Sequence, residues 1–134
     1  MRNIAVGALL AAAMALPGCA TNTNLSTSPT LPAAQGSVRY SVTKNNNTRI
    51  ALRVRHLAHP EKLTPPTDGY VVWTRETKDA PPQNIGALIV DKNLNGSLDA
   101  ETPLHSFELF ITAESSSQVK LPLGPPLLWT DYSR

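Results

Sequence analysis

Short runs in which apolar and polar side chains alternate constrain the fold of this chain more than any other feature. The clearest runs are 37–43, 49–57 and 106–114, where apolar residues fall at every second position. That spacing puts them on one face of an extended strand, because successive side chains point to opposite faces. Segments 84–91 and 125–132 are further apolar runs of strand length. The pattern therefore predicts β-strands with one buried face.

Turn-forming segments rich in Pro, Gly, Asn and Ser separate these runs, and no window shows a capped apolar stripe of helical period. Short alternating runs joined by turns favour antiparallel sheets, and two stacked sheets bury one face of each. We therefore predict an all-β fold, a single antiparallel β-sandwich of immunoglobulin-like type with about six to seven strands over residues 36–134. The predicted core consists of Val38, Tyr40, Ile50, Leu52, Val54, Val72, Ile89, Phe107, Leu109 and Ile111.

The run 69–76 differs from the others because it carries apolar side chains on both faces. Tyr70 and Val72 alternate with Val71 and Trp73. Two arrangements fit this pattern: a central strand that is buried on both sides, or a strand whose second face is covered by a loop. The residues of the run leave both open.

Residues 1–18 are typical of a lipoprotein signal peptide. Arg2 supplies a positive charge, and the uncharged run 4–16 is rich in Ala and Leu. As a helix that run would span about 20 Å, short of the roughly 30 Å of a bilayer core, which favours a cleaved signal. It ends in Leu-Pro-Gly-Cys, which resembles a bacterial lipobox with Cys19 as the lipidated residue, although Pro17 departs from the usual pattern. An ordinary secretory signal with an incidental cysteine is the alternative.

Cleavage before Cys19 fixes several expectations about the mature protein. Removing Arg2 lowers the formal charge from +2 to +1, so the balance gives no reason to expect nucleic acid as a partner. Cys19 is the only cysteine, so its lipidation leaves no thiol for a disulfide or a metal site. Acyl chains on Cys19 make the membrane the expected partner, with an envelope protein as the second partner class. Because Ala20 follows in place of Asp, we expect the periplasmic face of the outer membrane in a cell with two membranes.

Residues 19–35 are predicted to be a lipidated cysteine followed by a flexible linker. The segment 20–35 carries no charge and is rich in Thr, Ser, Asn, Pro and Ala, with only scattered Leu. Such a composition buries too little apolar surface to offset the entropy lost on ordering. We therefore expect a tether that lifts the domain off the membrane.

The second half of the sequence contains an ordered series of short motifs. Tyr-Val-Val-Trp at 70–73 is followed by a Pro-containing loop, the apolar run 85–90, a polar turn, the Phe-containing strand 106–114 and a Gly-Pro segment. In this order they resemble the extracytoplasmic, C-terminal domain of bacterial anti-sigma-K factors, which is a small β-sandwich. Such factors also carry a cytoplasmic sigma-binding part and a membrane-spanning helix, for which this sequence has no counterpart. The resemblance therefore implies a fold and an envelope setting, without sigma-factor binding or functional residues.

The segment Asp91–Asp99 reads DKNLNGSLD and has much of the pattern of a calcium-binding loop. With Asp91 as the first ligand, Asn93, Asn95 and Asp99 occupy the third, fifth and ninth positions, with a glycine at the sixth. The twelfth position holds Thr102, so the bidentate carboxylate that completes such a cage is missing. An Asn-Gly pair is also a strong tight-turn signal, since both residues tolerate positive φ. We therefore predict a turn between strands and expect no cofactor. Asp91, Asn93, Asn95 and Asp99 remain alternative calcium ligands.

His56, His59 and His105 are the histidines of the chain. They would make a zinc site only if the fold brought them together. Because positions 56 and 59 of a strand point to opposite faces, we predict surface histidines.

Arginines and tryptophans are the remaining candidates for binding. Arg49, Arg53 and Arg55 fall on the face of one predicted strand that is opposite its apolar residues. They could contact anionic lipid or an acidic polymer, but a solvated outer face is the simpler interpretation. Trp73 and Trp129 could stack on a sugar or a peptide, whereas a core position is the usual place for Trp in a small sandwich.

The sequence contains no nucleophile-elbow, HExxH or phosphate-loop motif, and we predict no enzymatic activity. The expected function is that of a lipid-anchored envelope protein with a binding or structural β-sandwich. One alternative is a sensory or regulatory envelope domain related to anti-sigma factors. The other is a calcium- or small-ligand-binding module.

Overall fold

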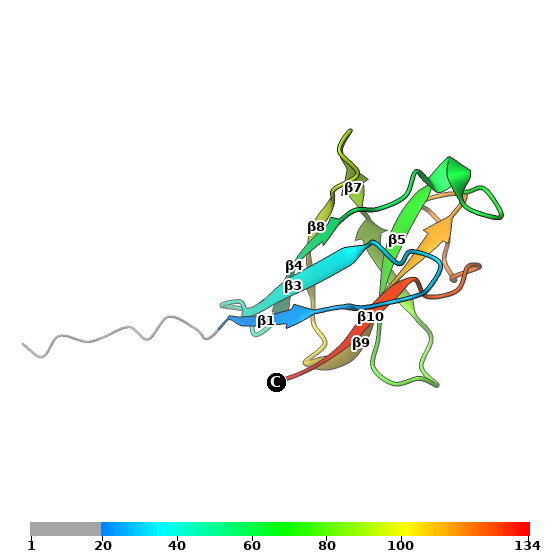
Figure 1. Cartoon of the computed structure of the whole chain (residues 1–134). Coiled ribbons are helices and arrows are strands. Elements are labelled where there is room, and N and C mark those ends of the chain that lie inside the picture. The colour runs from blue at the N-terminus through cyan, green and yellow to red at the C-terminus, as the bar shows by residue number, and fades with distance from the viewer. Residues whose placement is uncertain (1–19) are drawn as a thin grey trace, which may run out of the picture.

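The computed structural model describes residues 20–134, and the predicted signal peptide lies outside the described residues. Two five-stranded antiparallel sheets pack face to face and enclose the core (Figure 1). The elements in chain order are β1 (Thr21–Asn24), β2 (Ser26–Thr27), β3 (Gln35–Val42), β4 (Thr48–Arg55), the 3-10 helix η1 (Pro60–Lys62), β5 (Gly69–Arg75), β6 (Gln83–Ala87), β7 (Ile89–Val90), β8 (Gly96–Thr102), β9 (Ser106–Glu114) and β10 (Leu128–Ser133).

Hairpins alternate between the two sheets along the chain. Sheet A has the order β1-β3-β4-β8-β7, and sheet B has the order β2-β10-β9-β5-β6. The strands from β3 onward thus follow the A-B-E-D and G-F-C-C′ orders of immunoglobulin-type sandwiches, with β1 and β2 added at the edges. The predicted all-β antiparallel sandwich is confirmed.

Nine of the ten predicted core residues are buried, and Ile89 is the exception at 76% exposure. The predicted strand 84–91 is divided at Leu88: β6 belongs to sheet B, whereas β7 belongs to sheet A. Leu88 is buried and its N–H donates to the carbonyl of Tyr70 at 2.9 Å. The alternation restarts at this change of sheet, which turns the side chain of Ile89 outward. The prediction of Ile89 as a core residue is therefore wrong.

The predicted flexible linker is also wrong for residues 20–35, and so is a domain boundary at residue 36. β1 pairs with β3 from Thr21 opposite Tyr40 to Asn24 opposite Ser37, and β2 pairs with β10. Within this segment Leu25, Leu31 and Ala34 are buried in the core. Polar residues suit an edge strand, because pairing uses backbone groups and needs no apolar side chain. The described fold begins at Thr21. The number of strands is larger than the predicted six to seven, partly because β1 and β2 lie in the segment predicted to be a linker.

The second face of β5 is covered by the β9–β10 loop, residues 115–127, which we call the strap. β5 lies between β9 and β6, and Tyr70–Thr74 are all buried. Val71 and Trp73 form a second apolar cluster with Phe110, against which Val119 of the strap packs. β5 therefore combines the two arrangements that the sequence left open: it is an inner strand buried on both sides, and a loop covers its second face.

Buried hydrogen bonds hold the strap in place. The indole N–H of Trp73 donates to Thr112 Oγ1 at 2.9 Å, and this hydroxyl donates to Glu114 Oε1 at 2.9 Å. The same carboxylate oxygen accepts the N–H groups of Leu123 at 2.8 Å and Gly124 at 3.1 Å. Glu114 is only 2% exposed, so these donors take the place of water. The chain of bonds joins the buried Trp of sheet B to the far end of the strap.

The core also fixes the loop that precedes β5. Tyr70 is fully buried, and its hydroxyl donates to the carbonyl of Ala58 at 2.7 Å. Burial raises the pKa of Tyr70 to about 12, so the phenol stays protonated and remains a donor at neutral pH.

Candidate functional site

A row of aromatic side chains crosses the outer face of sheet B. The strand register places Trp129 opposite Phe110, and Phe110 opposite Trp73. Trp73 and Phe110 are buried beneath the strap with nearly parallel rings, whereas Trp129 is 38% exposed. Trp129 therefore ends the row where the strap no longer covers the sheet. Of the two Trp residues named from the sequence, only Trp129 can meet a ligand, and Trp73 has a structural position.

A row of ionisable side chains lies beside the aromatic one. Asp131 is opposite Glu108, and Glu108 is opposite Arg75. Arg75 Nη2 donates to Glu108 Oε1 at 2.9 Å, and the pair is largely shielded, with exposed side-chain fractions of 22% and 15%. The guanidinium carbon of Arg75 also lies 4.9 Å from the centre of the Phe110 ring, a cation–π contact. Both partners are thus fixed in place before any ligand arrives.

The two rows border a hollow of about 460 Å³. Its lining residues are Arg75, Lys78, Glu108, Pro126, Trp129 and Asp131. An aromatic face beside both cationic and anionic groups suits a polar ligand that has an apolar face and several hydroxyl or amide groups. We call this place the Trp129 hollow.

Among these residues, only Trp129 is recognisable from the sequence as a candidate for ligand binding. Positions 129 and 131, 108 and 110, and 73 and 75 each share a face of a strand, which was readable from the alternation. The order and register of the three strands decide that the pairs lie side by side, and those are non-local features. The sequence therefore shows which residues share a strand face, but it does not show that the three strands are neighbours.

The first part of the segment Asp91–Asp99, residues 91–95, forms the predicted turn between β7 and β8, and the rest belongs to β8. Asp91 Oδ1 accepts the N–H groups of Asn93 at 2.9 Å and Asn95 at 3.0 Å. The left-handed residue is Leu94, at φ 62°, and neither Asn95 nor its neighbour Gly96 adopts positive φ. The turn is therefore closed by the Asp91 side chain together with backbone hydrogen bonds between Asp91 and Leu94 and between Asp91 and Asn95, and the Asn-Gly explanation of it is wrong.

Gly96 serves close packing instead. A Cβ at this position would lie 2.9 Å from Leu57 Cδ1 and 3.1 Å from Leu88 Cδ1. Asp99, the last of the four alternative calcium ligands, lies on β8, where its carboxylate pairs with Arg53. The structure therefore gives both carboxylates of the set other partners.

The histidines occupy separate places. His59 Nδ1 is 3.6 Å from Glu61 Oε1 in the loop around η1, and His105 Nε2 lies 3.0 Å from the carbonyl oxygen of Asn46. His56 is exposed at φ 58°, where β4 has ended. Among residues 20–134, no three His, Cys, Asp or Glu side chains gather closely enough to hold a metal ion.

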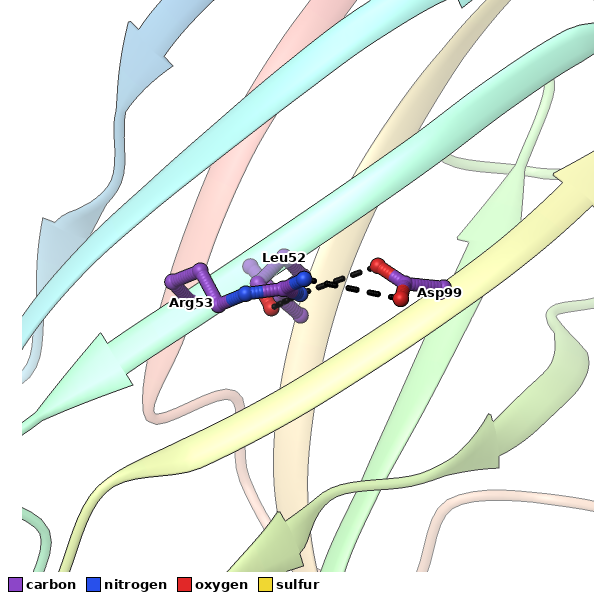
Figure 2. Close-up of polar contacts among 3 residues, drawn as sticks. All are labelled: Leu52, Arg53 and Asp99. Carbon is purple, nitrogen blue, oxygen red and sulfur yellow. Dashed lines mark hydrogen bonds and ion pairs between the residues drawn. The ribbon is translucent and has the colours of Figure 1, made fainter.

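The arginines of β4 lie on the outer face of sheet A, as predicted, and two of them donate hydrogen bonds to neighbouring side chains. Arg53 Nη1 donates to Asp99 Oδ1 at 2.9 Å and to the carbonyl of Leu52 at 2.7 Å (Figure 2). Arg55 Nη2 donates to Gln35 Oε1 at 3.3 Å. The register also places Arg49 opposite Glu101 of β8. Carboxylates on β8 thus offset much of the positive charge, which favours a solvated face over a polyanion site.

The predicted lipidation site, Cys19, lies outside the described residues, one residue before Ala20, where the description begins. No helix within residues 20–134 has the length and apolar character to cross a membrane. No protein-family model matches the chain, and no curated protein matches it either. The resemblance to anti-sigma-K factors accordingly stays a prediction.

Proposed function

We propose that this protein is a non-enzymatic, lipid-anchored protein of the cell envelope whose β-sandwich serves as a binding or structural domain. One observation carries the proposal: an apolar signal-like run ends in Leu-Pro-Gly-Cys, and a folded sandwich begins two residues after Cys19. A thioether-linked lipid at Cys19 explains why a secreted domain with a single cysteine has that cysteine at this place.

Metabolic labelling with a fatty acid in a bacterial host tests the anchor. We expect the wild-type protein to incorporate the label and to sediment with membranes, and Cys19→Ala to lose both properties. Ala20→Ser is the matched control, since it changes the neighbouring residue and keeps the thiol. A wild-type protein that is secreted without label contradicts the proposal.

We assign ligand binding to the Trp129 hollow and a saccharide as its ligand class. Sugar rings present an apolar C–H face that packs on an indole, together with hydroxyl groups that pair with both carboxylate and guanidinium groups. The fixed Arg75–Glu108 pair and the nearby Asp131 and Lys78 supply such groups around Trp129. Saccharides are also abundant at the surface where an anchored envelope domain would reside.

Titration with chitotetraose, followed by NMR, tests this assignment on the intact domain. We expect shifts of the Trp129 indole N–H signal and of the backbone signals of Arg75 and Lys78, with binding lost in Trp129→Ala. Arg49→Ala, on the opposite sheet, should bind as the wild type does. Unchanged spectra at millimolar oligosaccharide, where even a Kd of about 1 mM would be seen, contradict a saccharide site.

A further inference from the structure

We propose that one end of the sandwich, which carries the β3–β4 turn, rests directly on the lipid headgroups. This inference rests on the proposed lipidation of Cys19 and concerns the orientation that follows from it. Ala20 alone separates Cys19 from Thr21, the first residue of β1. Two Cα–Cα steps span at most about 7 Å, so the anchored cysteine cannot lie far from the sheet.

The direction of β1 decides which end faces the membrane. Thr21 is opposite Tyr40, and β1 runs antiparallel to β3, so the chain before Thr21 leads toward Val42 at the end of β3. The turn 43–47 follows Val42 directly and joins β3 to β4. In Figure 1 the start of β1 and the C-terminus lie at the same end of the molecule, and η1 lies at the opposite end.

Three chain segments are joined at this end, which we call the anchor end. Arg134 Nη1 donates to Asn46 Oδ1 and Arg134 Nη2 to the Asn46 carbonyl, both at 2.8 Å. His105 Nε2 lies 3.0 Å from the same carbonyl oxygen. The turn, the β8–β9 connection and the last residue thus form one cross-braced surface that moves with the sandwich.

The exposed side chains of the anchor end suit an anionic lipid surface. Val42 is an apolar residue that is 49% exposed, and Lys44 is exposed in the turn. The guanidinium of Arg134 adds a second cation. The nearby carboxylate of Glu101 accepts a hydrogen bond from Asn47, and Glu101 lies opposite Arg49. Cations beside a lipid anchor are attracted to anionic headgroups. An apolar side chain can enter the headgroup layer between them.

Two exposed positions offer reporters of this orientation. Asn45 precedes β4 in the turn 43–47, and Lys62 follows β4 in η1. The seven steps of β4 alone separate the two ends by about 23 Å at 3.3 Å per residue. Because lipidation blocks the thiol of Cys19, either Asn45→Cys or Lys62→Cys supplies a single labelling site in the full lipidated protein, and both variants keep Lys44.

Energy transfer to labelled lipid headgroups tests the inference. Each labelled variant is reconstituted in vesicles of phosphatidylethanolamine and phosphatidylglycerol that contain an acceptor lipid. We expect at least twofold higher transfer efficiency from position 45 than from position 62. A flexible 16-residue Gly/Ser insertion between Ala20 and Thr21, with a mean reach of roughly 20–24 Å, should remove most of that difference.

Flotation of the same samples separates the two ways in which the account can fail. Protein that floats with the vesicles and yet transfers equally from both positions contradicts the docked orientation alone. Protein that carries no lipid and stays in solution contradicts the anchor, and the docked end with it. If the protein floats, transfers unequally from the two positions and loses this difference on insertion of the linker, both the anchor and the docked orientation are supported.

Discussion

The outer faces of the two sheets differ, although both belong to the same small sandwich. On β4 of sheet A, buried and exposed side chains alternate along the strand, and its outer face is open to solvent. On β5 of sheet B, five successive residues from Tyr70 to Thr74 are buried, because the strap covers the outer side. The adjacent outward apolar residues Val71 and Trp73 thus mark the part of the face that a loop of the same chain covers.

The difference should appear most strongly when the covered face loses its largest side chain. Trp73→Ala removes a fully buried indole and the donor to Thr112, so we expect a loss of about 3–5 kcal/mol of unfolding free energy. Arg49→Ala on the open face is the control, and it should change stability by no more than about 0.5 kcal/mol. Urea denaturation measures both. Equal, small losses would show that the strap does not protect sheet B.

The strap itself can be released more locally through its buried carboxylate. Glu114→Ala leaves the N–H groups of Leu123 and Gly124 and the Thr112 hydroxyl without their acceptor, and we expect a loss of about 1–3 kcal/mol. Hydrogen exchange should then become faster at the amides of Leu123 and Gly124. Glu101→Ala, an exposed carboxylate on sheet A, should leave that exchange unchanged. Unaltered protection in Glu114→Ala would contradict its role in holding the strap.

One ion pair on each face gives a third comparison. Arg75–Glu108 on sheet B and Arg53–Asp99 on sheet A have the same 2.9 Å contact, but the exposed side-chain fractions are 22% and 15% in the first and 54% and 69% in the second. Double-mutant cycles with alanine should give a coupling energy of about 1.5–3 kcal/mol for the shielded pair. The exposed pair should give about 0.2–1 kcal/mol and weaken in high salt. A reversed order would contradict shielding as the cause.

The smallest effects are expected at the end of sheet A. Asp91→Ala removes the acceptor of two turn amides and should cost about 1 kcal/mol, in the range of side chains that cap backbone N–H groups. Since Asp99 is paired with Arg53, we expect millimolar calcium to leave the Tm of the wild type unchanged. A calcium-dependent rise in Tm that Asp91→Ala abolishes would instead support the calcium loop. Asp68→Ala, at an exposed carboxylate outside the turn, is the matched control.

The sequence predicted those parts of the fold whose signal is local. Alternation identified β3, β4 and β9, and their inward residues are buried. It failed at Ile89, because the change of sheet at Leu88 is set by packing between distant segments. It failed again at residues 21–27, where an edge position is stabilised through backbone hydrogen bonds that leave no mark on side-chain pattern.

The candidate site divides in the same way. Trp129 was recognisable as a residue type, whereas its neighbours Arg75, Glu108 and Asp131 come together through the order of β5, β9 and β10. The turn at 91–95 was predicted correctly, but the positive φ falls on Leu94. Asp91 determines that geometry through its side-chain oxygen, and Gly96 is needed where Leu57 and Leu88 approach. Sequence spacing alone does not distinguish a glycine that is needed for positive φ from a glycine that is needed for close packing.

The folded domain begins at Thr21, immediately after the proposed anchor. Hydrogen exchange on the mature, vesicle-bound protein tests it most directly, through the amides of residues 21–25. The N–H of Leu25 donates to the Gly36 carbonyl at 2.9 Å, and β1 pairs along β3. We expect protection of the paired amides in this segment well above that of an unstructured peptide. Exchange at the rate of a free peptide across residues 21–25 would restore the flexible tether and contradict the claim.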